Sequence, residues 1–195
     1  SGQCVGCLND DQCGNPAPVC DATTSACRLC RIDDECASDV CDVDTGACVA
    51  TSAVAYASAN GADTGACTQA DPCSLNRAIA FASAAPTAPT IRMLPGTYLV
   101  PLQVDGSESL VFVGTGASLR GPSSGVGIRV VNGANVELRG LDIDLSATDV
   151  VCGGTLLISS LVLRDLRIKA PLAASVVNAA RCTLKMQRVE LHANP

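Results

Sequence analysis

Three segments in the second half of the chain share one apolar pattern. They are VELRGLDID from Val136, LVLRDLRIK from Leu161 and LKMQRVELH from Leu184, which begin at nearly equal intervals along the chain. In each segment apolar residues alternate with other residues, a two-residue gap then separates the central apolar pair, and alternation resumes. Alternation with period two is typical of a β-strand, and the extra residue indicates a bend that restores the inward face.

Stacking these segments predicts four inward columns of apolar side chains. The columns are Val136–Leu161–Leu184, Leu138–Leu163–Met186, Leu141–Leu166–Val189 and Ile143–Ile168–Leu191. The segment LVFVGTGA from Leu110 fits an earlier coil, one such interval upstream of Val136. A strand unit that recurs at an interval of this size is typical of a solenoid, because one unit cannot bury its apolar face alone. We therefore expect a parallel β-helix.

The outward positions of the same register carry charges of alternating sign. The expected neighbours are Asp142–Arg167–Glu190 and Asp144–Lys169–His192. Opposite charges on neighbouring strands stabilise a sheet by roughly 0.2–1 kcal/mol per pair. This pattern favours a surface charge ladder over a catalytic dyad. Asp142 and Asp144 are therefore only weak candidates for catalytic residues.

Residues 1–50 contain a second, shorter repeat. They hold nine of the 13 cysteines, and the pattern of Cys7 to Cys27 recurs from Cys30 to Cys48. Four cysteines per unit allow three connectivities, among which the sequence does not choose. As a working hypothesis, the first cysteine pairs with the third and the second with the fourth. The expected bridges are Cys7–Cys20, Cys13–Cys27, Cys30–Cys41, Cys36–Cys48, Cys67–Cys73 and Cys152–Cys182, which leaves Cys4 unpaired, capped or intermolecular.

Two metal sites compete with this interpretation. The pairs Cys4-x-x-Cys7 and Cys27-x-x-Cys30 have the spacing of a zinc ribbon. Further cysteines interrupt that pattern and the next repeat duplicates it, which favours disulfides. The CDVDTGAC segment offers Asp42 and Asp44 as candidate calcium ligands, but two carboxylates fall short of a ligand set and a tight turn explains the same residues. Calcium is the one cofactor left open.

Charge and cysteine content restrict the partners and the compartment. Residues 1–50 carry nine acidic and two basic residues, a local charge of −7, while the whole chain carries −6. This balance disfavours nucleic acid and anionic membranes as partners. No stretch reaches the roughly 20 apolar residues of a membrane-spanning helix. Thirteen cysteines are typical of an oxidising compartment, and we expect a secreted or cell-surface protein.

A short helix is predicted ahead of the coils, in PCSLNRAIAFASA. Ser74 is the expected N-cap, and one helical face carries Leu75, Ala78, Ile79 and Ala82. Such a helix would cover the exposed edge of the first coil. The segment ADTGACTQADPCSLNRAI, then IRMLPGTY, then the apolar coils resembles the right-handed parallel β-helix proteins of the pectin-lyase-like superfamily, over residues 53–195. Residues 1–50 resemble the short cysteine-rich repeats of bacterial cell-surface proteins, which serve as stalks or spacers.

We therefore expect two domains in an otherwise all-β protein. Residues 1–50 form a small disulfide-rich repeat domain, and residues 51–195 form a partial right-handed parallel β-helix with an N-terminal capping helix. The last coil carries no predicted cap, which indicates a longer protein or an oligomer formed through that coil.

The resemblance implies polysaccharide chemistry, because many members of the superfamily are polysaccharide lyases or hydrolases. Their catalytic motifs have no residue-by-residue match here. Arg139, Arg164 and Arg188 lie near the predicted bend and are the candidate residues for holding an acidic polysaccharide. We expect a structural, adhesive or carbohydrate-binding module without catalysis, with a polysaccharide or another cell-surface protein as partner. The alternative is a fragment of a polysaccharide lyase or glycoside hydrolase.

Overall fold

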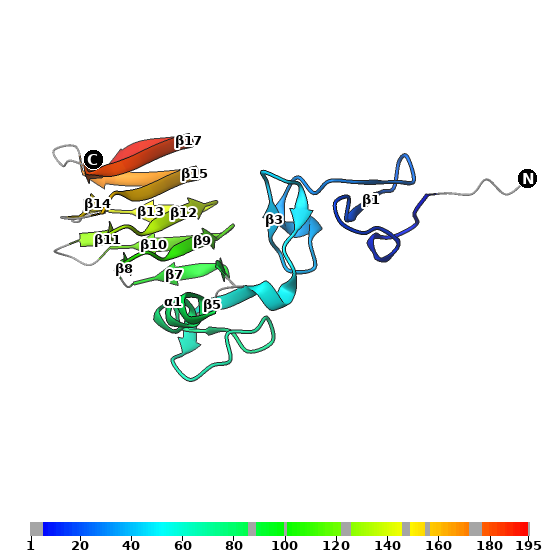
Figure 1. The fold of residues 1–195 in the computed structure, drawn as a ribbon, viewed down its shortest axis with the longest axis horizontal. Helices are drawn as coiled ribbons and strands as arrows, with labels where there is room; N and C mark the ends of the chain where they lie inside the picture. Colours follow the sequence, from blue (N-terminus) through cyan, green and yellow to red (C-terminus); the bar gives the residue numbers. More distant parts are fainter. Residues whose placement is uncertain are drawn as a thin grey trace, which may run out of the picture. The chain divides into compact units, whose positions relative to one another are not determined.

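The computed structural model describes residues 6–85, 89–99, 101–121, 126–145, 149–154, 157–171 and 177–194. Cys4 lies outside the described residues. By its internal contacts the chain divides into two compact units, residues 1–54 and 55–195. Figure 1 colours the first unit blue to cyan and the second cyan to red.

The cysteine-rich unit consists of two similar repeats. The first contains η1 (Asp10–Gln12), β1 (Val19–Asp21) and β2 (Ala26–Arg28), and the second contains η2 (Asp33–Glu35), β3 (Cys41–Asp42) and β4 (Ala47–Cys48). In each repeat the two strands form an antiparallel pair. The turn η3 (Thr51–Ala53) follows.

Disulfides hold both repeats together. Cys7 joins Cys20, Cys13 joins Cys27, Cys30 joins Cys41 and Cys36 joins Cys48. The buried apolar cluster of this unit is Val19 with three cysteines, so the bridges take the place of a packed core.

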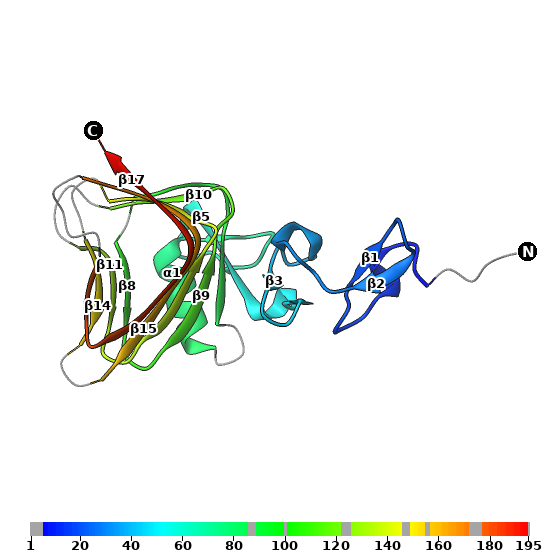
Figure 2. The same ribbon diagram turned by 90° about the horizontal axis from the view of Figure 1, so that it is seen from above.

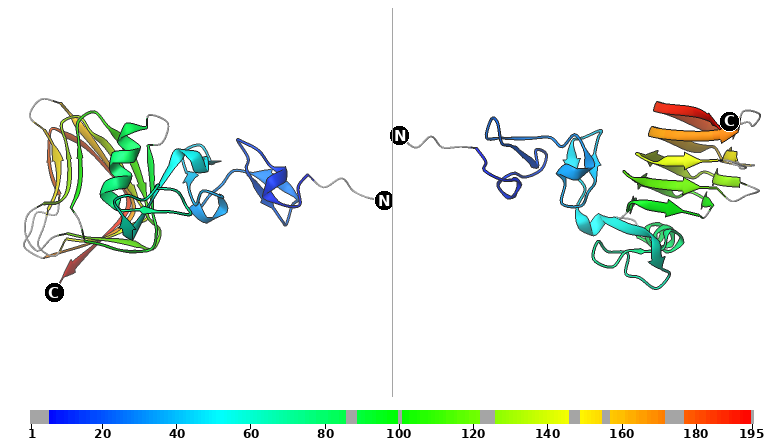
Figure 3. Two further views of the ribbon diagram at one scale, coloured as in Figure 1. Left: turned by 90° about the horizontal axis from the view of Figure 1, so that it is seen from below. Right: turned by 180° about the vertical axis from the view of Figure 1, so that it is seen from behind.

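The second unit is a parallel β-solenoid that opens with a strand and a helix. After β5 (Val54–Ala62) comes α1 (Leu75–Ala84), and the Cys67–Cys73 bridge closes the loop between them. The predicted cap is confirmed, because the Ser74 side chain accepts a hydrogen bond from the Arg77 N–H. The helix packs on β6 and β9 and lies at the first-coil end of the stack (Figure 3).

Successive coils add strands to the same faces. The strands are β6 (Thr90–Met93), β7 (Gly96–Tyr98), β8 (Leu102–Asp105), β9 (Ser109–Val113), β10 (Ala117–Arg120), β11 (Val126–Val131), β12 (Asn135–Arg139), β13 (Asp142–Asp144), β14 (Asp149–Gly153), β15 (Ser159–Pro171), β16 (Val177–Ala180) and β17 (Cys182–Asn194). One sheet has the order β5-β6-β9-β12-β15-β13-β10-β7 with β17 on β15, and the other has the order β16-β14-β11-β8. β15 and β17 each run through the bend, and Figure 2 shows the coils superposed around the core.

The register of the predicted inward columns is confirmed, but their members Met186 and Leu191 on β17 are 42% and 60% exposed. Val136 pairs in parallel register with Leu161, which pairs with Leu184, and the other columns follow the same register. The earlier coil also fits, since Leu110 pairs with Val136. Phe112, Leu138 and Leu163 are fully buried in one continuous core.

The bend between the two inward pairs is also confirmed. Its three stacked residues, Gly140, Asp165 and Arg188, have φ values of 70°, 54° and 50°. One residue in this left-handed conformation turns the strand while the apolar side chains on both sides stay inward. A disulfide away from this bend joins Cys152 on β14 to Cys182, the first residue of β17.

Candidate functional site

The outer face of β7, β10, β13, β15 and β17 carries the predicted ladder of charges. Its two columns are Thr97–Ser118–Asp142–Arg167–Glu190 and Arg120–Asp144–Lys169–His192. The intervening residues Tyr98, Leu119, Ile143 and Ile168 are buried, which turns these columns outward. We call these two columns the charge ladder.

Opposite charges on neighbouring rungs of the charge ladder are in contact. Arg120 Nε lies 3.6 Å from Asp144 Oδ2, and Arg167 Nε lies 3.3 Å from Glu190 Oε2. Within β17 itself, His192 Nε2 lies 3.4 Å from the same Glu190 oxygen. Pairs as exposed as Arg167 with Glu190 contribute at most about 1 kcal/mol each, so the ladder is a surface pattern more than a source of stability.

The three candidate binding arginines do not form one exposed cluster, and their role in holding a polysaccharide stays a prediction. Arg139 and Arg164 are neighbours in register, but they are only 5% and 6% exposed. Arg164 Nη1 lies 3.7 Å from a carboxylate oxygen of Glu137. The partner of Arg164 on β17 is Gln187, so Arg188 lies one position further along, in the bend.

Arg188 has a carboxylate partner of its own. Its Nη2 donates to Asp165 Oδ2 at 2.8 Å, and its Nε donates to the other oxygen of the same carboxylate. These hydrogen bonds hold the pKa of Asp165 below its usual range. The guanidinium is exposed but already neutralised.

A further buried arginine, Arg92, lies in the same column as Arg139 and Arg164, at a position that no sequence motif singles out. Arg92 and Arg139 both pair in register with Val113, so the three residues form one column. Arg92 is 5% exposed, and its Nε and Nη1 atoms have no hydrogen-bond partner among the residues that the structure describes. Strand alternation assigns Arg92 to the outer face, but no pattern in the sequence indicates that this position is buried.

The Asp42 carboxylate closes a tight turn. Its Oδ1 accepts hydrogen bonds from the backbone N–H groups of Asp44 and Thr45, at 3.0 and 3.4 Å. Asp21 makes the same contacts in the first repeat, with Thr23 and Thr24 at 2.8 and 3.3 Å, and these bonds lower its pKa. The recurrence favours the turn over the calcium loop as the reason for these aspartates.

Cysteines make up the groups of potential metal ligands found among the described residues. The two groups are Cys7 with Cys13 and Cys20, and Cys30 with Cys36 and Cys48. Every one of these sulfur atoms is in a disulfide, whereas zinc binds the free thiolate. The zinc-ribbon alternative therefore has no support in the residues described.

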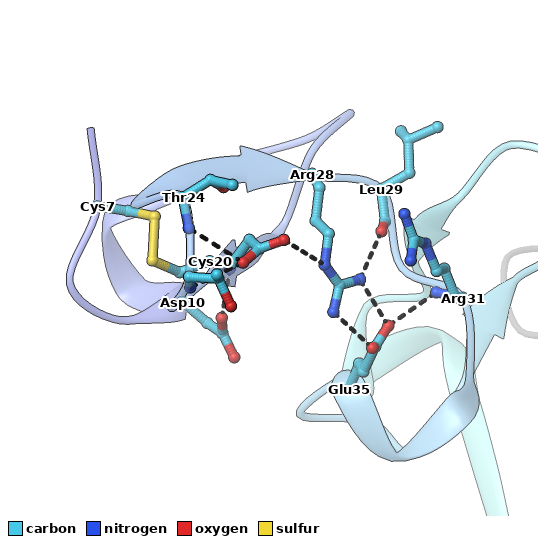
Figure 4. Close-up of polar contacts among 10 residues, drawn as sticks. Cys7, Asp10, Cys20, Thr24, Arg28, Leu29, Arg31 and Glu35 are labelled. Carbon is cyan, nitrogen blue, oxygen red and sulfur yellow. Dashed lines mark hydrogen bonds and ion pairs between the residues drawn. A yellow bond between two sulfur atoms is a disulfide. The ribbon is translucent and has the colours of Figure 1, made fainter. Parts of the chain in front are cut away.

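A second polar cluster joins the two cysteine-rich repeats, and Figure 4 shows its contacts. Arg28 Nη2 donates to Glu35 Oε1 at 2.7 Å, and Nη1 donates to Oε2 at 3.1 Å and to the Leu29 carbonyl at 3.0 Å. Arg28 Nε also lies 4.0 Å from Asp21. The hydrogen bonds from Arg28 lower the pKa of Glu35 to about 2. We call this arrangement the Arg28 clamp.

A hollow of about 530 Å³ adjoins the clamp, between the two repeats. The residues that line it are Ala17, Cys27, Arg28, Leu29, Cys30, Arg31, Val43, Asp44, Thr45 and Gly46. The sequence does not predict this hollow, because its walls come from two repeats whose relative placement no motif indicates.

No protein-family model, curated protein or solved structure matches the chain. Within the described part of the chain, no helix has the length and apolar character needed to cross a membrane. The charge ladder, the disulfides and the hollow are therefore the features of the chain from which a function can be inferred.

Proposed function

We propose that this protein is an extracellular surface module without catalytic activity, which serves a structural, adhesive or carbohydrate-binding role. The charge ladder is the observation that carries the proposal. Its side chains lie in parallel register, so consecutive rungs are separated by the spacing of neighbouring strands, about 4.8 Å. Regularly spaced charges of both signs suit contact with a linear polymer or with another extended surface.

The disulfides support the extracellular part of the proposal. Six bridges join twelve of the 13 cysteines, an amount typical of proteins that fold in oxidising compartments. The parallel β-solenoid agrees with the resemblance to the pectin-lyase-like superfamily, and the repeats agree with the resemblance to bacterial cell-surface stalks. A shared fold does not imply a shared activity, so the lyase or hydrolase alternative needs support from the site itself.

The surroundings of the two candidate catalytic aspartates favour surface pairing. Asp144 lies beside Arg120 on one side and Lys169 on the other, and Asp142 has Arg167 as its cross-strand neighbour. Catalytic carboxylate pairs work because their environments set different proton affinities and leave the oxygens open to the substrate. Here the neighbouring rungs place basic residues beside both aspartates.

Retention on immobilised polysaccharides tests the carbohydrate-binding role. We expect the protein to be retained on polygalacturonate more than on dextran, and to elute as salt screens the charges. The double variant Arg167→Gln, Lys169→Gln should lose this retention, because it removes the basic rung of the ladder. The matched control is Arg129→Gln, which removes an exposed charge from a different sheet of the same unit. Absence of retention on both polymers, or equal loss in the control, would overturn this role.

A further inference from the structure

The hollow between the two cysteine-rich repeats combines exposed apolar walls with a cation. Leu29 is 48% exposed and Val43 is 38% exposed, although both are large aliphatic residues. Arg31 lines the same hollow. Arginine is enriched among the residues that dominate binding at protein interfaces, and the exposed aliphatic side chains beside it offer apolar surface that a ligand can remove from water.

The guanidinium of Arg31 is available to a ligand. Among the described residues it makes no ion pair or hydrogen bond, whereas its backbone N–H donates to Glu35 Oε2 at 2.8 Å. Figure 4 shows the guanidinium turned away from the Glu35 carboxylate. Arg28, the other base of this unit, already holds Glu35 and cannot serve a ligand in the same way.

The walls of the hollow are held in place before any ligand arrives. The Arg28 clamp connects the repeats on one side, and the disulfides Cys13–Cys27 and Cys30–Cys41 fix the chain on both sides of Leu29. A preformed site loses little conformational entropy on binding, so modest contacts suffice for measurable affinity.

The charges of the unit define what the hollow would accept. Residues 1–50 carry nine acidic residues and two bases, so a strongly acidic partner is repelled by the unit as a whole. Arg31 can nevertheless pair with one carboxylate at its own position, and an aliphatic side chain can pack against Leu29 and Val43. A complementary ligand therefore has one acidic residue next to an aliphatic residue and basic residues on either side.

We propose that this hollow docks an extended peptide segment of a partner protein, in which an aliphatic and an acidic residue lie side by side between basic residues. This docking is independent of the polysaccharide contact proposed for the charge ladder. The carboxylate would accept hydrogen bonds from Arg31, and the aliphatic side chain would pack against Leu29 and Val43.

Titration of the ¹⁵N-labelled full chain with end-capped peptides tests the proposal by NMR. The peptide Lys-Leu-Glu-Lys should shift the amide signals of Leu29, Arg31 and Val43 in a saturable way. Lys-Leu-Gln-Lys should bind roughly fivefold more weakly, since it lacks the charge that pairs with an exposed arginine.

Two variants and one control complete the test. Arg31→Gln should bind both peptides equally, and it leaves the fold intact because the Arg31 side chain holds no partner among the described residues. Val43→Ser should lower the affinity for both peptides. Arg77→Gln, which removes an exposed arginine from α1, should leave both affinities unchanged.

Three results of the peptide titrations would overturn the proposal. They are the absence of saturable shifts at millimolar peptide, equal affinity of the wild type for the two peptides, and equal loss of affinity in Arg77→Gln. Shifts of the same amides on concentrating the protein alone would identify a second copy of the chain as the occupant, and would also contradict a peptide partner.

Discussion

At the scale of single residues, one difference between the two cysteine-rich repeats creates a contact between them. In the first repeat Gln12 Oε1 accepts a hydrogen bond from the Leu8 N–H, and in the second Glu35 Oε2 accepts one from the Arg31 N–H. The acid at this equivalent position adds a charge, and Arg28 binds both of its oxygens. A local turn contact thereby becomes a connection between repeats.

The Glu35 carboxyl should titrate far below an ordinary glutamate. Hydrogen bonds from Arg28 favour its charged form and lower its pKa from 4.5 to about 2. The stability that this pair contributes is fully present above pH 4.5 and is lost as the pH falls through about 2. The side-chain carboxyl signal of Glu35, followed by NMR against pH, measures the pKa directly.

The matched variant for this titration is Arg28→Gln, which keeps a hydrogen-bond donor but removes the charge. It should raise the pKa of Glu35 toward 4.5. A midpoint near that value in the unsubstituted protein would show that the clamp does not form in solution.

The prediction that three arginines lie together fails because one of them, Arg188, is one residue out of register with the other two. Basic character and nearness to the bend group Arg188 with Arg139 and Arg164. The offset that aligns the apolar columns already places Gln187 opposite Arg164 and Arg188 opposite Asp165. The Arg28–Glu35 pair escapes prediction for another reason, since it joins two repeats and neither repeat contains both partners.

At the scale of elements, the inward columns are the most predictable feature. Parallel stacking gives every coil the same register, so two segments aligned by their apolar residues already determine which side chains meet. The sheet formed by β8, β11, β14 and β16 is not predicted. Two apolar columns do stack in it, Leu102–Ile128–Val150–Val177 and Val104–Val130–Cys152–Ala179. Each strand contributes only one alternating pair to these columns, and the intervals between coils are unequal, so the sequence alone does not align them.

The loss of stability on shortening one side chain of an apolar column should depend on which coil carries that side chain. Leu163 is fully buried between Leu138 and Met186, whereas Met186, on β17, is 42% exposed. Leu163→Ala should lower the free energy of unfolding by about 2–5 kcal/mol, because it leaves a cavity between two coils. Met186→Ala in the same column should cost less than about 1 kcal/mol, since its surroundings are open.

Chemical denaturation followed by circular dichroism compares the two variants. Equal losses of stability would mean that β17 is covered in solution, or that Leu163 is not at the centre of the core.

At the scale of the whole molecule, the two parts of the chain are stabilised by different kinds of interaction. Residues 1–50 carry a charge of −7 and depend on disulfides, while residues 51–195 carry ten acidic and eleven basic residues and depend on stacked apolar columns. The composition of each part indicates which of these interactions stabilises it. The hollow belongs to the first part and the charge ladder to the second, so binding at either can be tested with the residues of the other unchanged.

Product release from a polysaccharide is the measurement that tests the central claim most directly. Polygalacturonate and neutral polymers are incubated with the protein, with and without calcium, and the appearance of unsaturated and reducing ends is followed. The proposed non-catalytic role predicts no products above the level without protein. Products formed by the wild type and lost in the double variant Asp142→Asn, Asp144→Asn would contradict it, and would make the charge ladder the active site of a lyase or hydrolase.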